Sequence, residues 1–455
     1  MTSFPGTESA LNSAKWIRPI PSTWRYIRLK WTISSSKNGV WGDEPDGGND
    51  DIVCIRVADF DRSQLSTVAV PPTSRRVERS QRHGRLLKFG DLLLEKSGGG
   101  DKQPVGALVS YSSTEPGVCS NFIARLVPAR GQHCRYLTYL HASLYFQRVN
   151  LRSIKQTTGI QNLDQEMYLD EVVAIPPFEA QRAIADFLDR KTAAIDALIE
   201  KKERLIALLA EKRAALIHRA VTKGLNPNAP MKDSGIPWIG EIPAHWRVVQ
   251  LRRVVQQLDQ GWSPVAYDQD RQPEEWGVLK LSAVKGGRYD PSHSKVLPAH
   301  ERPLPALVPR RGDLLITRAN TPDLVGDSCV VEREDPRTML CDLIYRVRLS
   351  KHALPGFVDL YLRSSSGRLQ IQADARGSSQ SMAKISPGHL LSWQVPLAPV
   401  DEQSEIVAAL VTVEASLRAG VERIQMQMAR LHEYRQALIT AAVTGQLAIP
   451  EQTSI

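Results

Sequence analysis

The chain has 455 residues, of which 42% are hydrophobic and 24% are charged, so it is long enough for roughly two to four domains with real cores. Its formal net charge of +9 and pI of about 9.3 favour a polyanionic partner, and nucleic acid is the first candidate. No apolar run approaches the roughly 18 to 20 residues of a membrane span, and the first residues lack the pattern of a signal peptide, which predicts a cytoplasmic protein.

The sequence repeats itself at an offset of 222 residues, so that Trp16 corresponds to Trp238. The clearest matching segments are WIxxIPxxWR (16–25 and 238–247), GDLL (90–93 and 312–315) and AVT (220–222 and 442–444). Two copies of one unit, each too long for a solenoid repeat, predict a tandem duplication with pseudo-two-fold symmetry.

Each copy begins with a segment of mixed character. Residues 15–178 hold strand-like stretches at 52–57, 92–94 and 172–175, separated by clusters of Gly, Pro, Ser and Asp. Residues 238–400 repeat this plan, and a linker rich in Pro, Gly and Asn at 223–237 joins the copies. Each copy is therefore predicted to be a mixed domain followed by a helix.

A long helical run closes each copy. Residues 179–222 contain no Pro or Gly, and their apolar residues, with Lys191, Lys202 and Lys212 filling the gaps, recur in alternating steps of four and three, which is the pattern of a coiled-coil seam. The predicted seam residues are Ile184, Leu188, Ile195, Leu198, Leu205, Leu209 and Leu216 in the first helix and Ile406, Leu410, Val413, Leu417, Ile424, Leu431, Tyr434 and Leu438 in the second. A bundle core or a homo-oligomer would also explain one such stripe, but two matched stripes in one chain favour pairing with each other. The periodicity leaves open whether the pair is parallel or antiparallel.

Motifs for catalysis are missing. The five cysteines lack the spacing of a zinc site, and Gly98-Gly99-Gly100 is not followed by the Lys-Ser/Thr of a phosphate-binding loop. Glu95-Lys96 could suggest a nuclease pair, but the second copy has Thr317-Arg318 instead. We therefore predict no catalytic residue, no metal site and no cofactor.

Positions that differ between the copies are candidates for separate recognition of DNA. They follow the GDLL strands or lie in the divergent segments 34–43 and 256–263, and 155–161 and 376–380. Cationic, amide and aromatic side chains there suit contacts to phosphates and base edges, although each alone could be an ordinary surface or packed residue. The candidates are Lys37, Asn38, Trp41, Lys96, Ser97, Gln156, Gln161, Gln260, Trp262, Arg318, Asn320, Arg376, Ser379 and Gln380.

These features together resemble the specificity subunits of type I restriction-modification systems. The resemblance rests on WIGxIPxHWR at 238–247, GDLLITR at 312–318, Pro-x-x-x-Gln at 177–181 and 399–403, and the AVT ending of each helical run. It implies an α+β fold in which two mixed target-recognition domains (1–178 and 238–400) are separated by two long helices (179–222 and 401–445) that pair as an antiparallel coiled coil, with a tail at 446–455.

The same resemblance implies that each recognition domain reads one half of an asymmetric, bipartite site in double-stranded DNA. It also implies that two methyltransferase subunits dock on the helices and that a translocating nuclease subunit joins the full complex. The methyl-donor and ATP sites of the family lie on those other subunits. The alternative that the residues leave open is a non-catalytic, duplicated scaffold that binds proteins rather than DNA.

Overall fold

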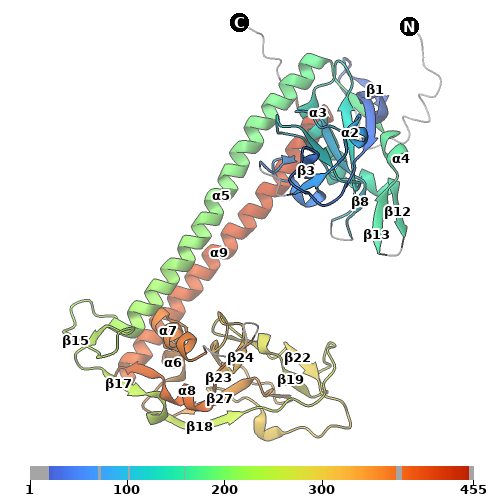
Figure 1. The fold of residues 1–455 in the computed structure, drawn as a ribbon. Helices are drawn as coiled ribbons and strands as arrows, with labels where there is room; N and C mark the ends of the chain where they lie inside the picture. Colours follow the sequence, from blue (N-terminus) through green and yellow to red (C-terminus); the bar gives the residue numbers. More distant parts are fainter. Residues whose placement is uncertain (1–19, 70–72, 101–102, 158, 376–381, 450–455) are drawn as a thin grey trace. The chain divides into compact units, whose positions relative to one another are not determined.

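The computed structural model describes residues 20–69, 73–100, 103–157, 159–375 and 382–449, and it divides into two compact units. Unit 1 comprises the residues up to Glu203 and those from Gln425 onward, and unit 2 is Arg204–Ile424. Each unit therefore holds one mixed domain and a part of each of the two long helices, α5 (Phe178–Lys223) and α9 (Val400–Val443) (Figure 1). The predicted α+β fold with two long helices is confirmed.

The mixed domain of unit 1 is built on a six-stranded sheet of order β2-β11-β7-β9-β5-β4. Two three-stranded sheets, β10-β3-β6 and β12-β13-β8, and the antiparallel pair β1-β14 adjoin it. Its strands are β1 Arg25–Arg28, β2 Ile33–Asn38, β3 Asp51–Ile55, β4 Phe60–Asp61, β5 Ser66–Thr67, β6 Ser74–Arg76, β7 Leu92–Glu95, β8 Ser97–Gly98, β9 Leu108–Ser110, β10 Gly117–Cys119, β11 Ile123–Pro128, β12 Ile154–Thr157, β13 Ile160–Leu163 and β14 Val172–Ile175, and its short helices are α2 Arg79–Arg82, α3 Cys134–Phe146 and α4 Gln165–Leu169.

Unit 2 repeats this topology with a four-stranded central sheet of order β18-β27-β23-β25. The pair β17-β29 corresponds to β1-β14, and the sheet β22-β19-β26 corresponds to β10-β3-β6. Its strands are β15 Met231–Asp233, β16 Glu241–Pro243, β17 Arg247–Gln250, β18 Val255–Gln260, β19 Gly277–Leu279, β20 Val284–Lys285, β21 Arg288–Tyr289, β22 Ser294–Val296, β23 Leu314–Thr317, β24 Ala319–Asn320, β25 Ser328–Val330, β26 Thr338–Met339, β27 Ile344–Leu349, β28 Ala383–Lys384 and β29 Gln394–Leu397, and its short helices are α6 Pro355–Arg363, α7 Ser365–Asp374 and α8 Pro387–Ser392.

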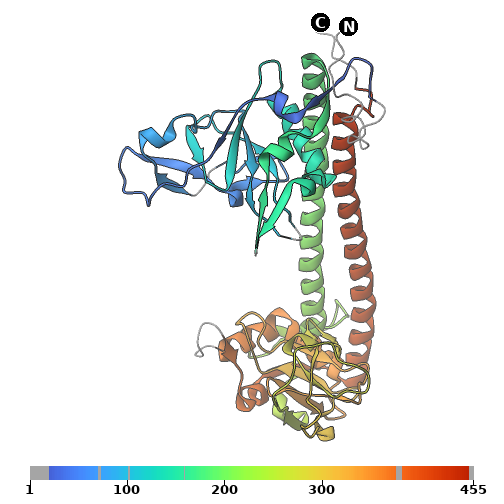
Figure 2. The same cartoon turned by 90° about the vertical axis from the view of Figure 1, so that its right-hand side faces the viewer.

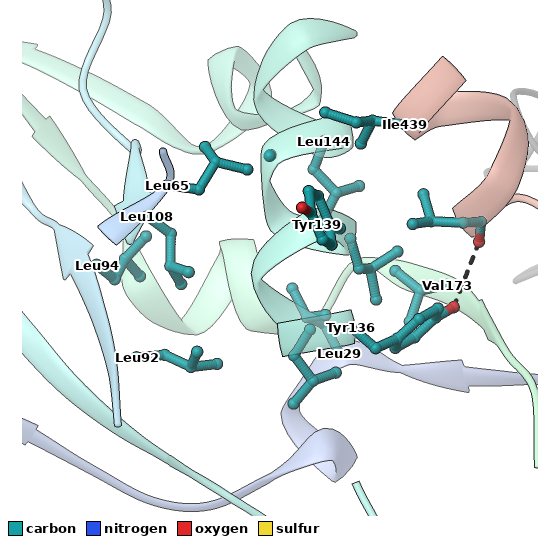
Figure 3. Close-up of a cluster of buried hydrophobic side chains, with 14 of the residues drawn as sticks. Leu29, Leu65, Leu92, Leu94, Leu108, Tyr136, Tyr139, Leu144, Val173 and Ile439 are labelled. Carbon is teal, nitrogen blue, oxygen red and sulfur yellow. Dashed lines mark hydrogen bonds between the residues drawn. The ribbon is translucent and has the colours of Figure 1, made fainter. Parts of the chain in front are cut away.

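Helix α3 forms the centre of the unit 1 core. Leu92, Leu94 and Leu108 of the sheet face α3 from one side, and Ile439 of α9 approaches it from the other (Figure 3). The Tyr136 hydroxyl, on α3, donates to the carbonyl oxygen of Val443 at 3.4 Å. The end of α9 is thus part of the hydrophobic core of unit 1, because its apolar face would otherwise be exposed to water.

The two long helices run antiparallel in each unit. In unit 1, Asp196 of α5 pairs with Arg435 of α9, and Lys202 further along α5 pairs with Gln427 earlier in α9. In unit 2, Arg213 pairs with Glu414. Both ribbon views show the helices side by side within each unit (Figures 1 and 2). The antiparallel pairing that the resemblance implied is therefore present.

The inward face of the helices differs from the predicted seam at three positions. Leu198 and Leu205 of α5 are 43% and 44% exposed, and Tyr434 of α9 is 57% exposed. The next residues along, Ile199, Ile206 and Arg435, are buried or half-buried instead. An undistorted helix has about 3.6 residues per turn, so its buried face advances past a strict 3.5-residue repeat within a few turns. The other predicted seam residues are all buried or half-buried: Ile184, Leu188, Ile195, Leu209, Leu216, Ile406, Leu410, Val413, Leu417, Ile424, Leu431 and Leu438.

The Pro-x-x-x-Gln segments join each long helix to its own mixed domain. Gln181 is 1% exposed; its side-chain oxygen accepts the His133 N–H at 2.9 Å, and its Nε2 donates to the Pro176 carbonyl at 3.0 Å. Gln403 is fully buried and makes the equivalent pair of bonds, to the Leu354 N–H at 2.8 Å and to the Ala398 carbonyl at 2.8 Å. A buried side-chain amide needs a donor for its oxygen and an acceptor for its nitrogen, and both positions supply them, which explains why glutamine occurs in both copies.

The GDLL segments start the central strand of each sheet. Gly90 and Gly312 both have φ of 87°, which favours glycine. The carboxylates that follow are buried ion-pair acceptors: Asp91 bonds Arg125 at 2.7 Å, and Asp313 bonds Arg348 at 2.8 Å. Both copies therefore have a turn that leads into a buried strand.

Candidate nucleic-acid interface

The candidate contact residues of unit 1 gather at one end of its central sheet. Strands β2 and β7 both pair antiparallel with β11, so they run in the same direction and end at the same edge. In the register, Asn38 lies opposite Ala124 and Glu95 opposite Ile123. Lys37 and Asn38 at the end of β2 are therefore close to Lys96 and Ser97 after β7. Lys37 and Asn38 lie in an exposed edge strand, although the sequence indicated a loop there.

The β12–β13 hairpin extends this end of the sheet. Strand β13 pairs with β8, which places Gln161 opposite Gly98 and Asn162 opposite Ser97. Gln161 is only 8% exposed, and its side-chain oxygen accepts the Val105 N–H at 3.2 Å. Its amide therefore holds the hairpin against the domain. The backbone of Gln156 faces Gln161 across the hairpin, and the Gln156 side chain lies outside the described part of the structure.

Lys96 and its neighbour Glu95 have different surroundings. Glu95 is 1% exposed, burial raises the pKa of its carboxyl group, and Arg62 lies 3.1 Å away as its ion-pair partner. Lys96 is half-buried, and desolvation lowers the pKa of its ammonium group. The Ser97 hydroxyl donates to the Asn162 side-chain oxygen at 2.7 Å. The pair is not arranged as a metal site, since Glu95 is neutralised by an arginine inside the domain.

Trp41 is 38% exposed, and one face of its ring is covered by an arginine. The Arg75 guanidinium lies 4.5 Å from the ring centroid, and its Nε donates to the Trp41 carbonyl at 3.3 Å. Arg85 likewise donates to the Asn38 carbonyl at 3.0 Å. Sequence reasoning missed both arginines. The density of cationic residues between Ser74 and Lys88 was the available signal.

Unit 2 assembles its candidate residues in the same way. Strands β18 and β23 both pair antiparallel with β27, with Gln260 opposite Tyr345 and Thr317 opposite Ile344. Gln260 and Trp262 therefore share an end of the sheet with Arg318 and Asn320. Trp262 is 37% exposed, and the Gln260 amide donates to the Asp342 carbonyl at 3.2 Å.

Arg318 and Asn320 of unit 2 are half-buried. A hydrogen bond from Arg318 reaches the Tyr345 hydroxyl, and the Asn320 side-chain oxygen accepts the Thr321 N–H at 2.9 Å. Asn320 lies in β24, which pairs with β28 after the segment 376–381. The candidates Arg376, Ser379 and Gln380 in that segment lie outside the described residues.

In both units a glycine lets the end of the edge strand pass close to the turn before the neighbouring strand. A Cβ on Gly39 would lie 2.1 Å from the Ser120 carbonyl oxygen, and a Cβ on Gly261 would lie 2.1 Å from that of Cys341. These glycines occupy equivalent positions of the two copies, directly after β2 and β18. Only glycine lets the end of the edge strand pass so near the turn that precedes β11 or β27.

Comparisons with known proteins agree with this architecture. No family model matches the chain. The EcoEI type I restriction enzyme specificity subunit of Escherichia coli is 28% identical over 213 residues, which cover 46% of this chain and 36% of the relative. The EcoKI type I specificity subunit of Escherichia coli strain K12 is 26% identical over 317 residues, which cover 68% of this chain and 64% of the relative.

The chain is thus similar in sequence to type I specificity subunits, as its motifs indicated. A solved structure concerned with complex assembly and conformational transition of a type I restriction-modification system contains a chain with the same fold, at a TM-score of 0.64 and 17% identity. That likeness covers 94% of this chain and all of the other. The matched segments span about a third and about two-thirds of these two specificity subunits.

The described residues form neither a candidate metal cluster nor a candidate membrane span. No group of three or more His, Cys, Asp or Glu side chains placed to hold a metal ion occurs among them. None of the helices in the described ranges is long and apolar enough to cross a membrane. The five cysteines are free, and burial raises the pKa of the Cys54 and Cys341 thiols to about 11.

Proposed function

We propose that the chain is the DNA sequence-specificity subunit of a type I restriction-modification complex and that it acts in the cytoplasm. The mixed domains, 1–178 and 238–400, are its two target-recognition domains, and each reads one half of an asymmetric bipartite site in double-stranded DNA. The long helices, 179–222 and 401–445, set the unread gap and dock two methyltransferase subunits. A translocating nuclease subunit completes the complex, and the chain itself supplies no catalytic group.

The observation that carries this proposal is the convergence of divergent polar residues on the same end of the sheet in both units. Lys37, Asn38 and Lys96 lie at one end of the sheet in unit 1, on either side of β11, and Gln260 and Arg318 lie likewise on either side of β27 in unit 2. Cationic side chains suit phosphates, whereas amides suit the edges of bases in the major groove. Two equivalent surfaces with different side chains are what two different half-sites require. The similarity to type I specificity subunits of Escherichia coli and Methanocaldococcus jannaschii supports the same role.

A binding selection from a randomised pool of DNA duplexes tests the proposal, with and without the methyltransferase subunits. We expect enrichment of two short sequences separated by a gap of fixed length. A pool that stays random in both conditions would refute DNA recognition.

The two ends of the central strands provide matched controls for this selection. Lys96→Ala, at the candidate end of β7, should weaken binding, whereas Lys88→Ala, exposed at the opposite end of the same strand, should not. In unit 2, Arg318→Ala and Arg311→Ala form the equivalent pair around β23. Equal effects within each pair would place the interface elsewhere.

A further inference from the structure

The turn between β10 and β11, residues 120–122, lies at the centre of the candidate interface of unit 1. On one side the Lys96 N–H donates to the Phe122 carbonyl oxygen at 2.8 Å. On the other side the Gly39 N–H donates to the Ile123 carbonyl oxygen at 2.9 Å. The turn is therefore fixed between the ends of β2 and β7, which carry the candidate contact residues.

Phe122 presents its side chain outward from this turn. It is 49% exposed, and Asn121 beside it is also exposed. An exposed aromatic residue on its own is ordinary on a protein surface. Here, however, the Phe122 carbonyl oxygen accepts the N–H groups of Lys96 and Ser97 at 2.8 and 3.3 Å, and Asn38 lies opposite Ala124, two residues further along the chain.

The equivalent residue of the second copy, Leu343, has a different environment. The turn before β27 has the same length: the Ile344 N–H donates to the Cys341 carbonyl at 3.2 Å, as the Ile123 N–H donates to the Ser120 carbonyl at 3.0 Å, so Leu343 stands where unit 1 has Phe122. The Arg318 N–H donates to the Leu343 carbonyl at 2.7 Å, as the Lys96 N–H does to that of Phe122. Leu343 nevertheless packs partly buried against the unit 2 core. The copies therefore share the backbone anchor and differ in whether the apolar side chain points into the domain or out of it.

We propose that Phe122 is a base-contacting residue of unit 1 and that it recognises the 5-methyl group of a thymine in the major groove. This inference rests on the proposed function. Among the groups that the four bases present in the major groove, the thymine methyl is the apolar one, and phenylalanine is a residue that contacts it. The neighbouring cation of Lys96 and the amide of Asn121 would meet a phosphate and a base edge, so that the ring is directed at a base rather than left in water.

Replacing thymine by uracil, one position at a time, tests this contact because it removes only the methyl group. The measurement is the dissociation constant of the full chain assembled with its methyltransferase subunits, on duplexes carrying the selected site. We expect one thymine in the half-site of unit 1 at which uracil weakens binding by about three- to five-fold, the factor expected for burying one methyl group. In Phe122→Ala the thymine and uracil duplexes should bind equally, and Phe122→Leu should retain part of the difference.

Phe89 provides the control, since it is 68% exposed and lies before the opposite end of β7. Phe89→Ala should keep the full preference for thymine, and circular dichroism of all variants should match the parent. A parent complex without a uracil-sensitive position in that half-site, or a Phe122→Ala variant that keeps the preference, would overturn the inference. If Lys96→Ala still weakened binding in that case, the proposed function would stand. A complex that selects no DNA sequence would refute both.

Discussion

The two long helices carry an arginine at equivalent positions of the repeat, and the structure predicts that only one of the two is critical for stability. Arg435 of α9 is 6% exposed; its guanidinium lies 3.0 Å from the Asp196 carboxylate and also bonds the Ser63 carbonyl oxygen. Its equivalent Arg213 pairs with Glu414, but its side chain is 41% exposed. Arg435 thus ties α9 to both α5 and the mixed domain within unit 1.

Removing one partner from a buried ion pair costs about 3–5 kcal/mol, because the other charge is left buried and unpaired. An exposed pair contributes only about 0–1 kcal/mol. Asp196 retains 19% of its side-chain exposure, so we expect Arg435→Met to cost about 3 kcal/mol, at the low end of the buried range. Arg213→Met leaves the Glu414 carboxylate, which is 16% exposed, without this partner, but it should cost less than Arg435→Met, because the Arg213 side chain is 41% exposed and water already screens that pair.

Hydrogen exchange of peptides from α5 and α9 is the suitable assay, since it reports local opening in a chain of two units that need not unfold in one step. A loss of about 3 kcal/mol corresponds to roughly 100-fold faster exchange of residues 425–443. Adding Asp196→Leu to Arg435→Met should restore much of the protection, because no unpaired charge then remains. Equal acceleration in the Arg213 and Arg435 variants, or a double variant no better than Arg435→Met, would refute this reasoning.

Four further outcomes are expected. A plot of log affinity for DNA against log salt should be steep, and Lys37→Ala should reduce its slope by about one; a flat plot for the parent would mean that phosphate contacts are not central. Removing seven residues at facing positions of both long helices shortens each helix by about 10 Å. The selected DNA should then have a gap between its half-sites altered by about three base pairs, or no DNA should bind. An unchanged gap would contradict the proposal that the helices set its length. Exchanging residues 15–178 for another recognition domain should alter one half-site in the selected sequence, and changes in both halves would count against separate reading. Burial lowers the pKa of His141 to about 3, so its contribution to the free energy of unfolding should be complete above about pH 6.5. Below that pH the contribution should fall by up to about 1.4 kcal/mol per pH unit towards pH 3, because the unfolded chain binds a proton that the folded chain does not. Urea titrations of His141→Gln should lack this pH dependence, and a pH dependence identical to that of the parent would exclude it.

The repeat is the feature that the sequence revealed most directly. Matching residues such as Gln181 and Gln403 make equivalent hydrogen bonds, because each connects the start of a long helix to its mixed domain in the same local geometry. The divergent residues were less informative individually. Gln161 has a side chain that could bond a base edge, yet its amide oxygen accepts a backbone N–H inside the domain.

The sequence by itself determined the number of copies, the two long helices and the turns that start the central strands, since these depend on residues near one another in the chain. Only the tertiary structure decided which side of each helix is buried and which strand ends meet. Whether Leu198 or Ile199 is the buried residue depends on the cumulative rotation of an undistorted helix, which a count of heptads does not include. Likewise, the position of Asn38 and Lys96 at the same end of the sheet depends on both β2 and β7 pairing with β11, a non-local register that no short stretch of sequence specifies.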